Sequence, residues 1–262
     1  MSKGQGLLFI GLLFILLTAC ASQPLSVTHQ PETLRIVTSD ACGPLMEELA
    51  AAYQKVRPWV TVRVEVFDAA VAEERLRAGA ADLAVLPWPG DAISSLWAVP
   101  FATDAVAVIV HPDVPAEGLS LAQLREVFRG RVGEWADGAF IQVVSREAGA
   151  GVRSVFEAVV MDGHDVTLTA LVVPDTAAAV EAVATIPGAI GYVSLGRLED
   201  GVRVLSLEGR SPRLGALGDY PLAYSVFLVA PSEPAGEARV FVQWVLGPQG
   251  QQWVTRRFGL PP

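Results

Sequence analysis

Strand-length apolar runs alternate with amphipathic helical patterns along most of the chain, and this alternation limits the possible folds more than any other feature. The first series has strand patterns at 34–37, 61–66 and 83–86, separated by helical patterns at 45–56 and 69–78. Strands joined by helices of about ten residues indicate parallel pairing through right-handed crossovers. The sequence therefore predicts an α/β protein with mainly parallel sheets flanked by helices.

A second series follows, and its last elements return to the pattern of the first. Its strand patterns lie at 105–110, 141–144, 190–193, 202–205 and 226–229. Residues 105–110 are almost wholly apolar, which is typical of a strand buried on both faces or crossing between lobes. A capping box at Ser120 and Gln123 opens one helix. Inward-facing residues at helical spacing predict the others: Val152, Val155, Phe156 and Val159; Val180 and Val183; Phe241, Trp244 and Val245; and a last helix over 248–258.

The N-terminal residues have the pattern of an export signal. A positive start precedes an apolar run over 7–18, which is short for a membrane span. Leu17-Thr-Ala-Cys20 then matches a bacterial lipobox, in which cleavage precedes the cysteine and a diacylglyceryl group is attached to its sulfur. We expect a signal peptide over 1–19, lipidation of Cys20 and a polar tether over 20–32. An uncleaved signal anchor with an incidental cysteine is the alternative.

Size and charge narrow the classes of function. After the signal and tether, about 230 of the 262 residues remain for folding, which suits two lobes better than one compact domain. Without residues 1–19 the chain carries 18 basic and 28 acidic side chains, a formal charge of −10. This excess argues against nucleic acid or an anionic membrane surface as a partner. The binding of a small anion depends on the charges of its local site rather than on the net charge of the chain.

Cysteine usage argues against a disulfide framework. With Cys20 lipidated, Cys42 has no cysteine partner. The acidic residues Asp40 and Glu47 nearby would disfavour a reactive thiolate. We expect Cys42 to be a small buried apolar residue.

The clearest local signal for chemistry is Ser145-Arg-Glu-Ala-Gly-Ala-Gly-Val-Arg153, between a predicted strand and a predicted helix. A helix N-terminus offers free N–H groups and partial positive charge to an anion. Gly149 and Gly151 allow the backbone to approach a ligand, and Arg146 and Arg153 can donate paired hydrogen bonds to its oxygens. The pattern favours an anion site, with a purely structural glycine turn as the alternative. A dinucleotide-binding motif is not indicated, because its third glycine is absent.

The stretch 146–156 resembles the R-E-x-G-S-G-T-R-x-x-F signature of the phosphate-binding proteins of bacterial phosphate ABC importers, in the type II periplasmic-binding-protein superfamily. Other segments resemble that family in the same order: 103–113, 119–130 with Glu134-Trp135, 189–193, 220–222 and 241–251. Together the resemblance covers about residues 34–260.

The resemblance implies a two-lobed fold in which helix N-termini of both α/β lobes clamp the ligand. Lobe 1 would comprise 33–108 and 223–262, and lobe 2 would comprise 109–222. The implied ligand-binding residues are Arg146, Gly149, Ala150, Gly151, Val152, Arg153, Ser39 and Asp40.

Several positions depart from the family where phosphate would be held. Ala150 and Val152 stand at the serine and threonine of the signature, so two hydroxyl donors are absent. The first-lobe ligand loop, 38–42, has few hydroxyls, and Asp68-Ala-Ala70 replaces a G-S-G turn. If each lost hydrogen bond to a charged ligand is worth about 1.5–3 kcal/mol, two losses weaken phosphate binding roughly a hundredfold to ten-thousandfold.

Three residues keep a structural interpretation beside the functional one. Asp40 could accept a proton from a protonated oxyanion, or it could cap the helix that begins near Gly43. Arg153 could contact the ligand or bridge to an acidic neighbour, which makes Arg146 the better candidate for a ligand contact. Trp88, between two prolines, could form a wall of the cleft or pack in a surface loop.

Two functions are therefore expected. The first is a lipid-anchored, extracytoplasmic solute-binding protein that captures phosphate or a related small oxyanion for an ABC permease. The second is a divergent binding-fold lipoprotein that has lost phosphate binding and acts as an accessory or sensor protein. An enzyme is not expected, because His29, His111 and His164 lack metal-ligand spacing and no nucleophile stands beside a base. No cofactor, metal or nucleic acid is expected either.

Overall fold

The computed structural model describes residues 29–87 and 95–261. The predicted signal peptide, Cys20, most of the tether and Trp88 lie outside the described residues. Pro31–Pro262 form one compact unit. Among the residues described, no helix is both long and apolar enough to cross a bilayer.

The elements follow the predicted order along the chain. The strands are β1 (Glu32–Ser39), β2 (Val60–Phe67), β3 (Leu83–Pro87), β4 (Trp97–Val110), β5 (Gly118–Leu119), β6 (Gln142–Arg146), β7 (Leu171–Val173), β8 (Ala189–Ser194), β9 (Arg203–Val204), β10 (Ser206–Leu207) and β11 (Ala223–Ala230). The helices are α1 (Gly43–Val56), α2 (Ala69–Arg77), α3 (Leu121–Phe128), α4 (Gly151–Phe156), α5 (Thr176–Thr185), α6 (Gly236–Leu246) and α7 (Pro248–Val254). Short helical turns are η1 (Asp40–Cys42), η3 (Glu157–Met161) and η4 (Leu195–Arg197).

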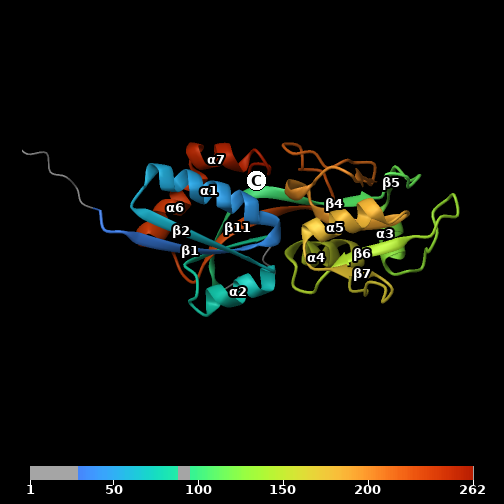
Figure 1. The fold of residues 1–262 in the computed structure, drawn as a ribbon, viewed down its shortest axis with the longest axis horizontal. Helices are drawn as coiled ribbons and strands as arrows, with labels where there is room; N and C mark the ends of the chain where they lie inside the picture. The colour runs from blue at the N-terminus through green and yellow to red at the C-terminus, as the bar shows by residue number, and fades with distance from the viewer. Residues whose placement is uncertain (1–28, 88–94, 262) are drawn as a thin grey trace, which may run out of the picture. The chain divides into compact units, whose positions relative to one another are not determined.

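Among the described residues, nine strands form one continuous sheet in the order β2-β1-β3-β11-β4-β8-β6-β7, with β9 beside β4. The pairs β1–β2, β1–β3, β6–β8 and β6–β7 are parallel, as the strand and helix alternation predicts. Strand β4 is long enough to serve both lobes, because its first part pairs with β11 and its last part with β8. The expected two-lobed α/β fold is confirmed (Figure 1).

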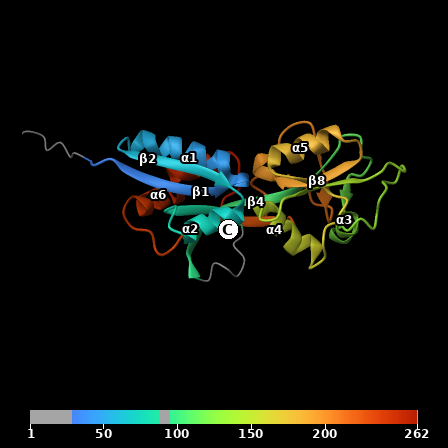
Figure 2. The same ribbon diagram turned by 60° about the horizontal axis from the view of Figure 1, so that its bottom comes forward.

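Helices cover both faces of each half of the sheet, as Figure 2 shows for α1 and α2 in the first lobe and for α4 and α5 in the second. The alternation of side chains along β1 explains this arrangement. Ile36 packs in the same core cluster as Leu45 of α1, whereas Val37 packs with Leu76 of α2. Both layers bury apolar side chains, so the strands read as nearly continuous apolar runs.

Three predicted details are wrong. Val159 was expected to face inward, but it is 39% exposed while Val160 is fully buried. The turn η3 is a π-helical turn, which adds a residue to the helical repeat and moves the inward position by one. The strand predicted over 202–205 is shorter and forms only β9 (Arg203–Val204), and the last helix, predicted to reach 258, ends at Val254.

A buried carboxylate ties the crossing strands together. Asp104 of β4 accepts hydrogen bonds from Ser194 Oγ at 2.5 Å, from Tyr224 Oη of β11 at 2.6 Å and from Gly196 N at 3.1 Å. Burial raises the pKa of Asp104, and the three donors oppose that rise. Asp104 therefore links β4, the strand that serves both lobes, to β11 on one side and to β8 on the other.

Candidate functional site

The side chain of Arg146 lies at the end of β6, where that strand meets the first lobe. It is 1% exposed. Its Nη1 donates to Thr176 Oγ1 at 3.2 Å, and its Nη2 donates to Pro174 O at 3.0 Å. Its Nε is buried without a hydrogen-bond partner among the described residues. A buried guanidinium with one open donor is suited to an anionic oxygen.

Asp40 follows β1 and brings a carboxylate of the first lobe to this guanidinium. Its Oδ2 accepts from Arg146 Nη1 at 3.2 Å, from Thr176 N at 3.1 Å and from Thr176 Oγ1 at 2.5 Å. Its Oδ1 lies 3.5 Å from Arg197 Nη1. The alternative that Asp40 caps the helix at Gly43 is wrong, because its carboxylate instead accepts from the first residue of α5 in the other lobe.

The glycine-rich turn before α4 lies directly against the first lobe. Gly149 O accepts from Ala70 N at 3.2 Å. Gly149 has φ of +95°, which favours glycine, and a Cβ added there would lie 3.2 Å from Ala70 Cβ. A Cβ added at Gly151 would lie only 2.2 Å from Pro87 Cγ. Both glycines are therefore required for this close approach of the lobes.

Little space remains between these groups. The cavity has a volume of about 10 Å³, roughly that of one water molecule. Its lining residues are Ser39, Asp40, Ala41, Asp68, Ala69, Arg146, Ala150, Gly151 and Val152. The hydroxyl of Ser39 is buried here without a hydrogen-bond partner among the described residues. Burial raises the pKa of Asp68 at this cavity, and the charge of Arg146 opposes that rise.

Arg153 supports the site from behind. Its Nε donates to Glu157 Oε1 at 2.6 Å, and its Nη1 donates to Arg146 O at 2.7 Å. The bridge to an acidic neighbour is therefore present. Through the second bond, Arg153 holds the backbone of Arg146 at the end of β6.

Cys42 lies in the first-lobe core and is fully buried, as expected. Burial raises the pKa of its thiol to about 12. A thiol of this kind is inert at neutral pH.

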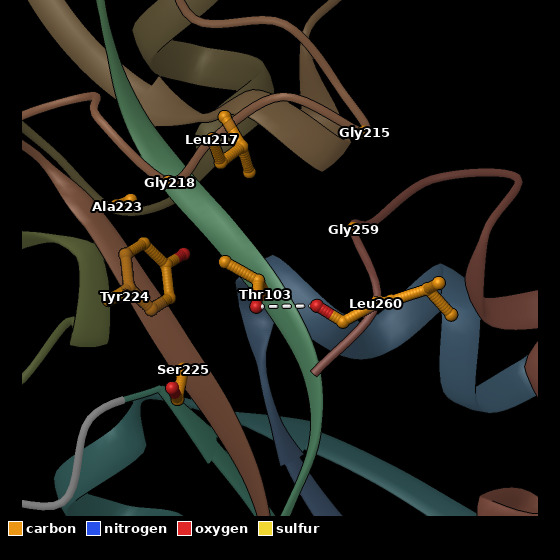
Figure 3. A pocket seen from close by; sticks show the side chains of 9 residues that line it. All are labelled: Thr103, Gly215, Leu217, Gly218, Ala223, Tyr224, Ser225, Gly259 and Leu260. Carbon is orange, nitrogen blue, oxygen red and sulfur yellow. Dashed lines mark hydrogen bonds between the residues drawn. The ribbon is translucent and has the colours of Figure 1, made fainter. Parts of the chain in front are cut away.

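A larger pocket, of about 420 Å³, lies beside the crossing strands β4 and β11 (Figure 3). Thr103 Oγ1 donates to Leu260 O at 2.7 Å along its wall. The described residues that line it carry no charged side chain, so it lacks the electrostatic features of an oxyanion site.

The sequence profile of the PBP superfamily domain matches residues 25–249, which is most of the chain. The chain belongs to the PBP superfamily.

Relatives within the PBP superfamily agree with this assignment. The Pseudomonas aeruginosa "Phosphate-binding protein PstS" is 26% identical over 267 aligned positions, covering 87% of this chain and 82% of the relative. A Clostridium perfringens structure, named as a phosphate ABC transporter substrate-binding protein with bound phosphate, has a TM-score of 0.81 at 23% identity. It covers 88% of this chain and 99% of that one. An ABC-type phosphate transport receptor from Vibrio cholerae has a TM-score of 0.75 at 24% identity and covers 87% and 100% of the two chains. These similarities confirm the type II periplasmic-binding-protein fold.

In this member of the PBP superfamily, the predicted site residues meet between the lobes. Ser39, Asp40, Arg146, Ala150, Gly151 and Val152 line one cavity, Gly149 contacts the first lobe beside it, and Arg153 lies behind. The sequence interpretation missed Thr176 and Arg197, which both bond to Asp40. Thr176 begins a helix after the short strand β7, and that position could have marked it. The turn that carries Arg197 gives no such signal.

Proposed function

We propose that the chain is an extracytoplasmic solute-binding protein that captures phosphate or a related small oxyanion for an ABC importer. The observation that supports this most is the buried guanidinium of Arg146, which meets the first lobe with one donor still open. The relatives, which are named as phosphate-binding proteins and as a phosphate transport receptor, point to the same ligand class.

The bound oxyanion would take its hydrogen bonds from Arg146, from Ser39 Oγ and from the backbone N–H groups of the first residues of α4. Ala150 and Val152 add no hydroxyl donor, so the arginine carries a larger share of the binding than in the family signature. The cavity of about 10 Å³ requires the lobes to separate before such a ligand enters. As a carrier for a permease, the chain would bind and release its ligand unchanged.

Isothermal titration of the purified chain tests this proposal. With phosphate, sulfate, molybdate and tungstate as separate titrants, we expect at least one to bind with a dissociation constant below about 1 mM. The anion that binds is also expected to raise the melting temperature, because it binds only the folded state. Four titrations without heat and without thermal shift would contradict the proposal.

We also propose that Cys20 anchors the chain to the membrane through a lipid. The lipobox at residues 17–20 supports this. In cells fed a labelled fatty acid, the Cys20→Ala chain is expected to lose the label. Cys42→Ala is the matched control, since it removes the other cysteine and should keep the label. Label retained on the Cys20→Ala chain would contradict the anchor.

The contact between Asp40 and Arg146 favours a second candidate, a binding-fold lipoprotein that acts as an accessory or sensor protein without capturing phosphate. In that case the carboxylate replaces the ligand permanently. The same four titrations separate the two functions, because the second predicts no binding of any of these anions by the natural chain. Co-purification of an ABC permease would exclude the second function.

A further inference from the structure

We propose that Asp40 is an internal anion that holds the two lobes closed when no external oxyanion is bound. This inference rests on the proposed function only in treating Arg146 as the ligand-binding arginine. The Asp40 carboxylate would occupy the place that a small oxyanion takes. The ligand and this carboxylate would therefore compete for the same donors.

The donors to the Asp40 carboxylate all belong to the other lobe. Arg146 ends β6, and Thr176 begins α5, and both donate to Oδ2. Arg197 of η4 donates to the backbone oxygen of Asp40 at 2.8 Å and lies 3.5 Å from its Oδ1. Because β1 carries Asp40 and the second lobe carries every donor, these bonds exist only while the lobes are in contact.

The charges at this contact favour a carboxylate. Two guanidinium groups, those of Arg146 and Arg197, converge on one acidic side chain. The side chain of Arg146 is 1% exposed and that of Asp40 is 21% exposed, so water screens the pair only partly. A charge-assisted contact of this kind resembles the contact between an arginine and a bound oxyanion.

The space at the contact excludes a second anion. The remaining cavity of about 10 Å³ has room for about one water molecule, not for a tetrahedral oxyanion. The backbone bond from Ala70 N to Gly149 O closes one side, and Gly151 lies against Pro87 on another. An oxyanion can therefore reach the inner Nη1 of Arg146 only after the Asp40 carboxylate has left it.

Amide hydrogen exchange of the full chain, measured in buffer without a binding anion, tests the closed state. Ala70 N–H is a suitable reporter, because it donates across the lobes without touching Asp40. We expect it to be protected in the natural chain. In Asp40→Ala it should exchange at least about tenfold faster, because the lobes spend more time apart. Asp40→Asn keeps the size of the side chain, loses its charge and should change exchange in the same direction.

Two further variants make the result specific. Gly151→Ala places a Cβ against Pro87 and should unprotect Ala70 with Asp40 still present, which shows that Ala70 reports closure. Asp82→Ala removes a first-lobe aspartate whose ion pair with Arg35 does not cross the lobes, and it should leave Ala70 protected.

Titration with inorganic phosphate separates this inference from the proposed function. We expect Asp40→Ala to bind phosphate at least about tenfold more tightly than the natural chain, because no internal anion competes. The inference would be overturned by an unprotected Ala70 in the natural chain, or by an Ala70 that is as well protected in Asp40→Ala and Asp40→Asn as in the natural chain. If Asp40→Ala opens the lobes but no variant binds any anion, the inference stands and oxyanion capture is wrong.

Discussion

Replacing Arg146 by alanine is expected to lower the free energy of unfolding by about 3 kcal/mol and to weaken oxyanion binding by about a hundredfold or more. The substitution leaves the Asp40 carboxylate without its buried partner and leaves Pro174 O without a donor. Asp40 is partly exposed and keeps its bonds from Thr176, which places the cost at the lower end for a broken buried ion pair. The open Nε of Arg146 and the Nη1 that an oxyanion would reach after Asp40 leaves are lost at the same time.

Denaturant unfolding and isothermal titration measure these two effects, and the chain offers a matched control. Arg239 also bonds one carboxylate, that of Glu233, and one proline carbonyl, that of Pro234. Its side chain is 52% exposed, so Arg239→Ala should cost no more than about 1 kcal/mol and leave binding unchanged. An Arg146→Ala chain that keeps every anion affinity would show that the ligand binds elsewhere.

Phe156→Ala is expected to lower the free energy of unfolding by about 3–5 kcal/mol, through lost apolar burial and the cavity left behind. Phe156 is fully buried on α4 and stacks on Tyr192 at 4.2 Å between ring centroids. Tyr192 Oη in turn lies 3.0 Å from Ser145 Oγ and accepts from Arg146 N at 3.4 Å. We therefore also expect weaker oxyanion binding, because loss of the stack loosens the position of Arg146.

Phe140→Ala provides the control for size and residue type. Phe140 is 66% exposed, and its removal should change the free energy of unfolding by less than about 1 kcal/mol. Denaturant melts of the three chains, fitted with a common slope, give the comparison. A Phe156→Ala chain as stable as Phe140→Ala would mean that the aromatic stack behind α4 does not hold the second lobe together.

Most of the fold could be predicted because inner strands such as β3 and β8 are buried on both faces, and because helices such as α1 and α3 bury one apolar face. The boundaries of α1 and α3, for example, follow from Pro58 and from the capping box at Ser120. The π-helical turn after α4 could not, because Val159 and Val160 are chemically alike. Helical spacing alone predicts that Val159 faces inward, whereas Val160 is the buried residue.

The candidate site could be predicted only where its residues follow a strand. Asp40 follows β1 and Arg146 ends β6, so each lies at the carboxyl ends of the parallel strands of its own lobe, and these two ends meet between the lobes. Their mutual contact could not be inferred, because it depends on how far the lobes close. Local sequence patterns contain no information about how closely the two lobes approach each other. Thr176 and Arg197 belong to the site only because the lobes are in contact.

The position of β11 in the sheet also affects how the chain is assembled. Residues 223–230 lie between β3 and β4, so the first-lobe sheet stays incomplete until this late segment arrives. The parallel strands β6, β7 and β8 all lie within 142–194 and can pair earlier. In a chain that folds from its N-terminus onward, the second-lobe strands can therefore pair first, while β3 presents an open apolar edge. Chains interrupted before 223 would keep that edge, which would make them prone to aggregation and to proteolysis.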